Sequence, residues 1–574
     1  MGFKLMFNFK RRFRHLIGLT TLVFIASACG SSASTSSSTT SSVVPATKSG
    51  GQLTYALDEE PAGFNYLKAG SGLFVTQEIM DPVWPSAFVV QPNLTPALNS
   101  YLLTSATLTS TKPQTVVYNI NPKAVWSDGT PISAEDFIYA WQSQSGLPQF
   151  KDVGGLAYLP LKTSGYNQIQ SVTSSDGGKR ATVVFSKPYS DWKSLFSPML
   201  PAHIAMTVGF DNGFNTFGPA LQVSGGPYMV QSYTPGQDVV LVPNKKYWGP
   251  IPKLSQIVYR FVLDDNQQPP AVQNGEVQMV SPALASVNFY DAVKSLPGFH
   301  VTVLPALEFQ HLDFNESNPY LAMASIRHAL AYGTDRQTIT ARTAGQILPS
   351  IKPLNNRIYM PTQLPYQNTS GSYGKFDPAL AKTLLKASGM TMGADGYFHP
   401  NFGPEKGQDF SLTLSTTSGV PVRQQIEELF QSEMKSIGVN IVIQNYTASK
   451  LFGTIAHTGE FDIIEFAWVQ TPFASINQAI YCSYTNVSCK QNFDHYANPT
   501  VDNLFTKALT TVNPAQTAKY YNEIDSILWK DMVTLPLFQQ PSLYGWSTSY
   551  TGIVPNTSTL GIPWNAQDWA ALAQ

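Results

Sequence analysis

The sequence predicts an α/β fold, and three segments support this prediction. Residues 421–437 carry apolar side chains along one helical face, and the helix that they predict ends at Gly438. Residues 439–443 follow at once as a strand-like run rich in β-branched side chains. A helix, a glycine and a buried strand in quick succession form an α/β unit. A further strand-like run, at residues 51–57, opens the predicted globular body.

Two more strands are predicted in the first third of the chain, at residues 116–120 and 181–185. Between them, Asp128-Gly129 indicates a turn. Ser133 is followed three residues later by Asp136, which is close to a capping box and predicts the start of a helix.

Three more helices are expected further along the chain. The first covers residues 319–333 and ends at Gly333. The second begins with Asp377 as its N-cap, has Pro378 in its first turn, and stops at Gly389. The third covers residues 514–530. No short-period repeat is present.

The N-terminus has the pattern of a secretory signal. Five basic residues precede an apolar run at 16–25, and the small residues 26–28 lead to Cys29. A cysteine at this place is typical of bacterial lipoproteins, in which it becomes the lipidated first residue. A transmembrane anchor is the alternative, but residues 16–28 fall short of the ~20 apolar residues that span a bilayer. Arg11-Arg12 leaves twin-arginine export as a weaker alternative.

Residues 29–49 are dominated by serine and threonine. Such a stretch buries too little apolar surface to offset its ordering entropy, so it is predicted to be a flexible tether. The sequence therefore divides into a signal peptide at 1–28, a tether at 29–49 and a body.

Composition excludes a nucleic-acid partner. Six of the 36 basic residues precede Asp58, which leaves 30 basic against 37 acidic residues in the rest of the chain. A body with this acidic balance lacks the basic footprint of a nucleic-acid-binding protein. Only 13% of the residues are charged, which suits an extracytoplasmic protein with a neutral polar surface.

The chain has three cysteines, and the lipid prediction uses Cys29. Cys482 and Cys489 lie close together in an exported chain, so a small disulfide loop is predicted, with two free buried thiols as the alternative. A metal site is disfavoured because His495 is the only further nitrogen ligand nearby, and no cofactor is predicted.

Five sequence blocks resemble one family. Residues 126–137, Trp-Ser-Asp-Gly-Thr-Pro-Ile-Ser-Ala-Glu-Asp-Phe, form the strongest block. The second block joins residues 225–228 with residues 244–249, and the other three are residues 274–277, 326–336 and 376–385. Together they resemble the solute-binding proteins of peptide-type ABC importers, the family 5 group that includes oligopeptide- and dipeptide-binding proteins. Turns and caps explain most of these residues, so the blocks indicate the family without marking ligand contacts.

The resemblance implies a bilobed type II periplasmic-binding-protein-like fold, with two α/β lobes and a hinge. Lobe I is expected at residues 50–305 plus 530–574, with an extra subdomain inserted at about 80–217. Lobe II is expected at residues 306–529. The ligand would lie in the cleft, and the lobes would close over it.

The resemblance also implies where the ligand lies. One cleft wall is expected in the loop after the first strand, at Glu59, Glu60, Ala62 and Phe64. The other is expected at Glu465, Trp468, Thr471 and Phe473. Several peptide binders of the family carry an aspartate where this chain has Thr471. A threonine brings no counter-charge for a peptide's amine, so Glu465, Glu59 or Glu60 would have to supply it.

The predicted function is capture of peptides or peptide-like solutes for an ABC importer. The expected protein is a monomer, lipid-anchored at Cys29 on the outer or periplasmic face of the membrane. Its expected partners are permease and ATPase subunits. The chain has none of the common hydrolase or phosphate-loop motifs, so it is predicted not to be an enzyme. The alternatives are a secreted hydrolase of peptides or glycans, and the same fold with a sugar, metal chelate, haem or lipid-like cargo.

Overall fold

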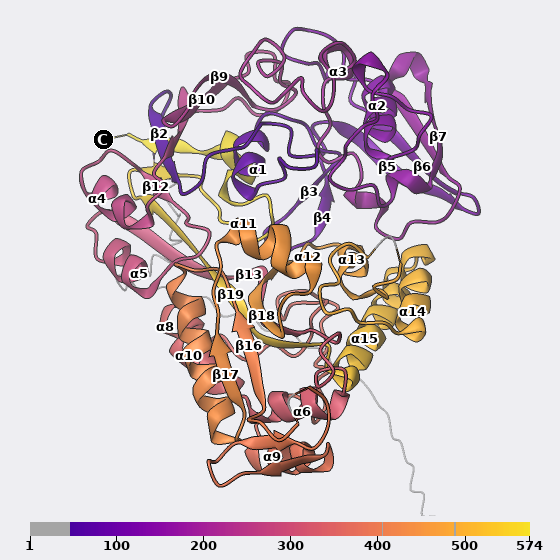
Figure 1. The fold of residues 1–574 in the computed structure, drawn as a ribbon. Coiled ribbons are helices and arrows are strands. Elements are labelled where there is room, and N and C mark those ends of the chain that lie inside the picture. The colour runs from indigo at the N-terminus through magenta and orange to yellow at the C-terminus, as the bar shows by residue number, and fades with distance from the viewer. Residues whose placement is uncertain (1–45, 405, 487–488, 574) are drawn as a thin grey trace, which may run out of the picture. The chain divides into compact units, whose positions relative to one another are not determined.

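A ten-stranded mixed sheet is the largest element of the computed structural model, which describes residues 46–404, 406–486 and 489–573 (Figure 1). Its strand order is β17-β16-β18-β13-β19-β12-β2-β11-β10-β9. The strands are β2 (Gln52–Leu57), β9 (Tyr228–Thr234), β10 (Asp238–Pro243), β11 (Gln256–Phe261), β12 (Met279–Val280), β13 (Phe299–Phe314), β16 (Ser411–Ser415), β17 (Asn440–Ile443), β18 (Ile463–Val469) and β19 (Thr534–Ser547).

Two long antiparallel strands, β13 and β19, lie at the centre of this sheet and join its two halves. Their register shifts between Pro305 and Phe309. On one side of the pair, β12 and β11 run parallel to β2; on the other, β16 runs parallel to β17 and β18. The mixture of parallel strands and crossover helices confirms the predicted α/β class.

The predicted helix–strand unit is confirmed as α10 (Pro421–Ser436) followed by β17. Ile426, Phe430 and Met434 are fully buried, because the apolar face of α10 packs into the hydrophobic core on this side of the sheet. Gly438 follows with a φ of 86°, a left-handed conformation that glycine adopts without a Cβ clash.

A separate antiparallel sheet, in the order β5-β6-β8-β7, falls within the predicted inserted subdomain. Its strands are β5 (Leu103–Thr111), β6 (Gln114–Ile120), β7 (Ile169–Ser175) and β8 (Arg180–Phe185), and α2 (Ala134–Gln144) packs beside them. The capping box is confirmed, since Asp136 accepts a hydrogen bond from the Ser133 N–H (2.9 Å) and the Ser133 hydroxyl accepts one from Glu135 (3.3 Å).

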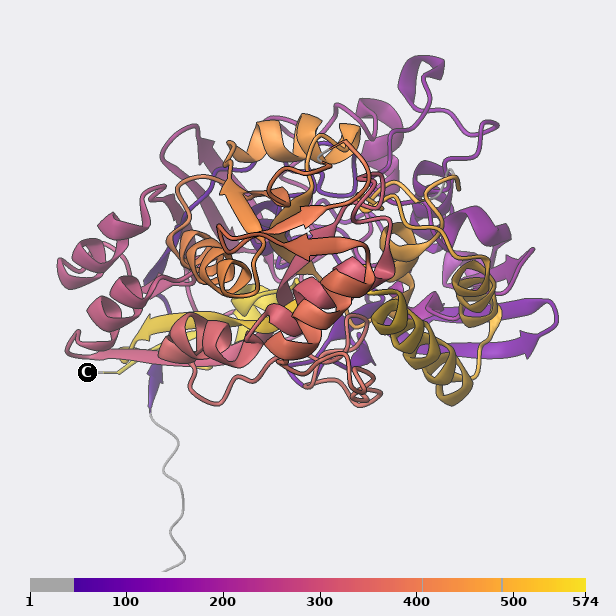
Figure 2. The same cartoon turned by 60° about the horizontal axis from the view of Figure 1, so that its bottom comes forward.

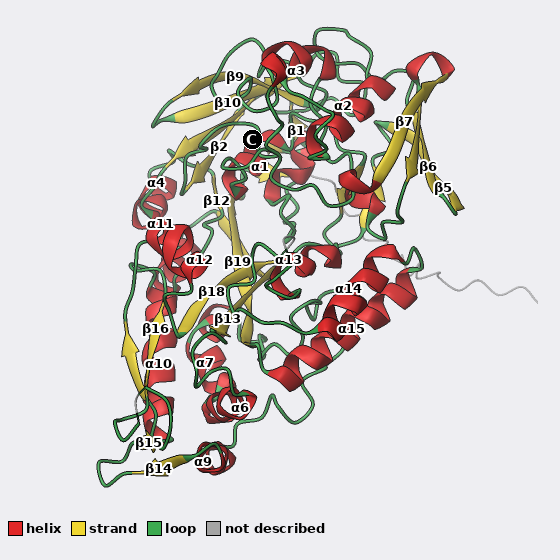
Figure 3. Ribbon diagram, turned by 45° about the vertical axis from the view of Figure 1, so that its right-hand side comes forward, coloured by secondary structure: helices red, strands yellow, loops and turns green. Residues whose placement is uncertain are grey.

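The helix predicted at 319–333 begins later than expected, as α6 (Ala324–Gly333). The Asn318 side chain accepts backbone hydrogen bonds from Tyr320 (2.8 Å) and Leu321 (3.3 Å), which holds the preceding residues in a turn. The other two helices are confirmed as α9 (Pro378–Ala387), capped by Asp377, and α15 (Pro514–Asp531). Helix α15 lies beside α14 (Pro499–Thr510), as Figure 3 shows.

The remaining helices are short. They are α1 (Phe74–Met80), α3 (Ala202–Val208), α4 (Gln268–Gln273), α5 (Val287–Lys294), α7 (Arg336–Arg342), α8 (Ala344–Ile347), α11 (Ala448–Lys450), α12 (Ala456–Thr458) and α13 (Gln478–Tyr481). Two small hairpins pair β3 (Phe88–Val90) with β4 (Pro96–Leu98), and β14 (Met390–Met392) with β15 (Phe398–Pro400).

The two ends of the described chain meet in a three-stranded sheet. Strand β1 (Thr47–Lys48) pairs with β21 (Ala570–Leu572), which also pairs with β20 (Tyr550–Thr551). Figure 2 shows the C-terminal end beside the indigo segment where the description begins. Residues 47 and 48, which fall at the end of the tether predicted at 29–49, are held in this sheet.

Residues 46–573 group into one unit by their contacts, so the boundaries proposed for lobes I and II remain predictions. Three large hydrophobic clusters nevertheless lie on the two sides of β13 and β19. One surrounds β2, α1 and β9–β11, and the other two surround the helices next to β16–β18. The predicted signal peptide, most of the tether and Cys29 lie outside the described residues.

Candidate functional site

The loop that follows β2 is held by the neighbouring strands rather than left open. Glu60 accepts hydrogen bonds from the Tyr233 hydroxyl (2.6 Å) and the Gly236 N–H (2.9 Å), both at the β9–β10 turn. Glu59 and Ala62 are exposed. Partial burial of its carboxyl group and, to a lesser extent, the nearby Asp58 charge raise the pKa of Glu59. Glu60 therefore has a structural partner, whereas Glu59 is the free carboxylate of this loop.

Two residues predicted at the ligand surface have core positions instead. Phe64 is 1% exposed and packs edge-on against Tyr233, with ring centroids 5.1 Å apart. Glu465 is fully buried on β18, where it accepts a hydrogen bond from the Thr416 hydroxyl (2.8 Å). Its second neighbour is Arg423, whose Nε lies 3.9 Å away. Burial raises the pKa of Glu465, and the Arg423 charge opposes this shift. The sequence alone could not show that Phe64 packs against Tyr233 or that Glu465 contacts Thr416, because each partner lies far away along the chain on another element.

Trp468 also lies in a core, at 8% exposure. Its ring stacks on Phe493 with centroids 5.8 Å apart and meets Phe466 edge-on at 4.8 Å. The indole Nε1 has no hydrogen-bond partner among the described residues. Trp468 thus packs within a hydrophobic core.

Thr471 and Phe473 do line a cavity, of about 230 Å³, which we call the central pocket. It lies where residues 471–473 meet segments that are far away in sequence. These segments are the end of the loop after β2 (66–67), strand β3, residues 161–166, residues 193–197 and residues 559–560. The Thr471 hydroxyl hydrogen-bonds with the backbone O (3.0 Å) and N–H (3.1 Å) of Phe473, which fixes this turn.

Two charged side chains line the central pocket, and both are cationic. Lys162 and Lys193 line it, and its lining includes no aspartate or glutamate. The Lys193 ammonium lies 5.7 Å from the ring centroids of both Phe88 and Trp192. Burial lowers the pKa of Lys162, while the negative charge of Asp191 raises it. Sequence reasoning missed both lysines, since neither belongs to a family block.

Three hydrogen bonds connect residues 189–191 to the part of the chain beyond β18. The Ser475 N–H donates to Asp191 Oδ2 (3.0 Å), and the hydroxyls of Tyr189 and Ser475 lie 3.2 Å apart. The Ser190 N–H donates to the Leu509 carbonyl (2.8 Å). Burial raises the pKa of Asp191, and the contacts with Ser475 oppose this shift.

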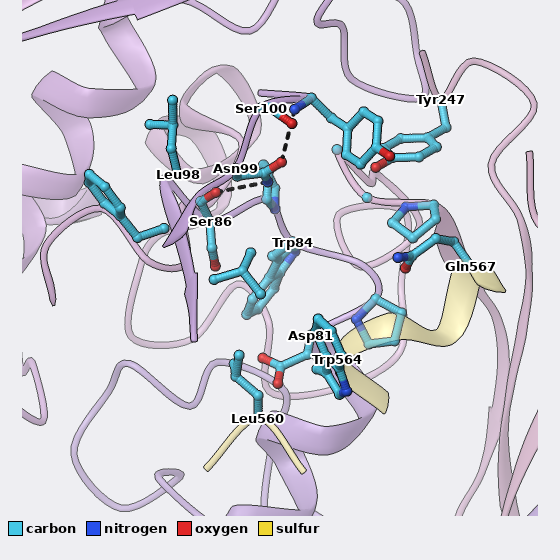
Figure 4. A pocket seen from close by; sticks show the side chains of 18 of the residues that line it. Asp81, Trp84, Ser86, Leu98, Asn99, Ser100, Tyr247, Leu560, Trp564 and Gln567 are labelled. Atoms are coloured by element: carbon cyan, nitrogen blue, oxygen red, sulfur yellow. Dashed lines mark hydrogen bonds between the residues drawn. The ribbon is translucent and has the colours of Figure 1, made fainter. Parts of the chain in front are cut away.

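A second cavity, of about 220 Å³, neighbours the central pocket and shares Ser86, Phe88 and Leu560 with it. Figure 4 shows Trp84, Tyr247 and Trp564 around this aromatic pocket, with Asp81 beside them. Burial raises the pKa of Asp81 well above its ordinary value. No residue predicted to contact ligand lines this pocket, and its aromatic side chains come from segments too far apart to form a local pattern.

The structure pairs Cys482 with Cys489 in a disulfide, with Cα atoms 5.7 Å apart. Among the described residues, one group brings three metal-type ligands within 4.8 Å of one another: Asp395, His399 and Asp409. His399 Nε2 lies 2.9 Å from Asp395 Oδ2, so these two already form a pair. They lie on and next to the β14–β15 hairpin and line neither of the two pockets described above.

No helix in the described part of the chain has both the length and the hydropathy needed to cross a bilayer. Within this mixed α/β fold, the central pocket lies where segments distant in sequence meet, which is a common place for a small-molecule site. Residues 98–487 match the model of bacterial extracellular solute-binding proteins, family 5. The chain belongs to this family, which is non-catalytic. The alternative of a secreted hydrolase is therefore wrong.

Similar proteins support the assignment. The oligopeptide-binding protein OppA of Mycobacterium tuberculosis is 31% identical over 507 residues, which cover 87% of this chain and 81% of OppA. The periplasmic EDTA-binding protein EppA is 27% identical, with a TM-score of 0.84 over 92% of this chain and 98% of EppA. Bacillus subtilis AppA, in complex with a nonapeptide, has a TM-score of 0.74 at 20% identity, covering 92% of this chain and 100% of AppA. The predicted fold is confirmed.

Proposed function

We propose that this protein captures peptides or peptide-like solutes outside the cytoplasm and delivers them to an ABC importer. The central pocket is the observation that carries the proposal. It lies where residues 471–473 face the segment after β2, as expected for a ligand held between two walls. The 31% identity to a protein named for oligopeptide binding supports peptides as the cargo.

We also propose a lipid anchor at Cys29 and a tether that ends before β1. An anchored protein of this kind stays near its importer while its body samples the membrane surface. One acyl chain alone binds a membrane weakly, so stable anchoring needs at least two chains. The partners would be two permease subunits and, through them, cytoplasmic ATPases.

A metal chelate is the second candidate cargo. It is supported by the similarity to an EDTA-binding protein and by the two lysines that line the central pocket without a carboxylate. Both candidates carry carboxylates, but a chelate has no peptide backbone to pair with the walls of the pocket.

A binding screen separates the two cargoes. The full chain would be tested by thermal shift and calorimetry against a mixed peptide library and against EDTA chelates of iron and nickel. A peptide cargo predicts stabilisation by peptides, with the bound peptide recovered intact. Stabilisation by chelates alone would overturn the peptide assignment, and recovery of cleaved peptide would contradict binding without turnover.

A further inference from the structure

Two positive charges face the central pocket without a direct counter-ion. Lys162 and Lys193 line the cavity, and neither forms an ion pair within 4 Å among the described residues. Both residues expose part of their side chain to solvent, whereas burial of the Lys162 ammonium lowers its pKa. The cavity therefore has an excess of positive charge.

The nearest carboxylate does not neutralise this charge by contact. Asp191 influences Lys162 electrostatically, but its Oδ2 is occupied by the Ser475 N–H (3.0 Å). Lys193 has only aromatic neighbours, Phe88 and Trp192, which orient its ammonium without supplying a full negative charge.

The opposite wall supplies no negative charge either. The family resemblance implies that Thr471 stands where several peptide binders carry an aspartate, and its hydroxyl is already bonded to Phe473. Glu465, the carboxylate closest in sequence, is fully buried and held by Thr416. A ligand ammonium in this pocket would meet two like charges and no carboxylate among the lining residues.

We propose that the central pocket is an anion site, in which Lys162 and Lys193 hold a carboxylate of the solute. The inference rests on the proposed function and defines the end of the solute that the pocket selects. A carboxylate satisfies both ammonium groups through charge-assisted hydrogen bonds. Ser164 and Ser194, which also line the cavity, add hydroxyl donors that a carboxylate can use. The selected end of a peptide is then its free C-terminus, and a free N-terminal amine is not required.

The test compares three forms of one hexapeptide: the free acid, its C-terminal amide, and the N-acetylated free acid. EDTA serves as a polycarboxylate probe without a backbone.

Each of these four ligands is titrated calorimetrically into the full chain, into the double variant Lys162→Met/Lys193→Met, and into Lys187→Met. Lys187 is an exposed lysine of the same segment that does not line the pocket, so it controls for loss of surface charge. The double arginine variant, Lys162→Arg/Lys193→Arg, keeps the charge and checks that the sites tolerate substitution.

The inference predicts at least tenfold weaker binding of the amide than of the free acid, and little effect of N-acetylation. The double methionine variant should lose the preference for the free acid, whereas Lys187→Met and the arginine pair should keep it. Equal binding of acid and amide, or a preference that survives in the methionine pair, would overturn the anion site and leave the peptide function standing. If EDTA is the only probe that binds, and the double methionine variant no longer binds it, the anion site is supported and the peptide function is contradicted. If no probe binds, both fall.

Discussion

The backbone N–H of Ser475 donates a hydrogen bond to Asp191 Oδ2 over 3.0 Å, across 284 residues of sequence. Asp191 follows the four-stranded sheet β5-β6-β8-β7, and Ser475 follows β18. Together with the contacts of Tyr189 and Ser190, this bond holds two walls of the central pocket against each other. The geometry of the pocket therefore depends on contacts between residues that do not line it.

Asp191→Ala should weaken this contact. A hydrogen bond to a charged acceptor contributes about 1.5–3 kcal/mol, so the Ser475 amide should exchange with solvent about ten- to a hundredfold faster. Solute affinity should fall as the walls separate more often. Hydrogen exchange measured by mass spectrometry checks the first effect, and calorimetry checks the second. Asp176→Ala, at an exposed turn of the same segment, is the control; equal exchange in the two variants would show that the bond does not hold the walls.

Trp468→Ala should destabilise the fold by about 3–5 kcal/mol, because a nearly buried indole leaves a cavity between Phe466 and Phe493. The sequence favoured a ligand contact, for which binding would weaken while stability stayed unchanged. Urea denaturation decides between the two roles. A loss below 1 kcal/mol, with binding abolished, would restore the original assignment.

Phe473→Ala should behave in the opposite way. Phe473 is half-buried and lines the central pocket, so its truncation removes contact surface for the solute and little core packing. We expect affinity to fall by about tenfold, which corresponds to ~1.4 kcal/mol, with a nearly unchanged melting temperature. An unchanged dissociation constant for a solute that stabilises the wild type would exclude Phe473 from the binding surface.

Asp136 should make stability depend on pH. Burial raises its pKa from 3.8 to about 6. The folded chain thus holds this proton more tightly than the unfolded chain. Its stabilising contribution is complete below pH 3.8 and is lost as the pH rises through about 6.

Asp136→Asn removes the titration. Relative to this variant, the wild type should lose about 2 kcal/mol of unfolding free energy between pH 3.8 and 6.5. Denaturant unfolding over this range measures the difference, with Asp176→Asn as the exposed control. A pH-independent difference would mean that Asp136 is not protonated in the folded protein near pH 5.

Local signals in the sequence predicted local structure well. Ser133, Asp377 and Gly438 were identified as helix ends because caps and left-handed glycines depend on a few adjacent residues. The helix at 319–333 started late because the Asn318 side chain competes for the first backbone N–H groups.

The site was predicted only in part. Thr471 and Phe473 line the pocket, whereas Phe64 and Glu465 are buried by residues that only the tertiary fold brings near. Lys162 and Lys193 were missed, because cavity electrostatics depends on which distant loops converge and not on any spacing along the chain.

The most direct test of solute binding at the central pocket is calorimetric titration of the full chain with the best solute from the library, followed by mass spectrometry of the recovered solute. We expect one solute per chain, recovered with unchanged mass, and at least tenfold weaker binding in Phe473→Ala at the same melting temperature. A cleaved solute, or equally tight binding in wild type and Phe473→Ala, would contradict capture without turnover at this pocket.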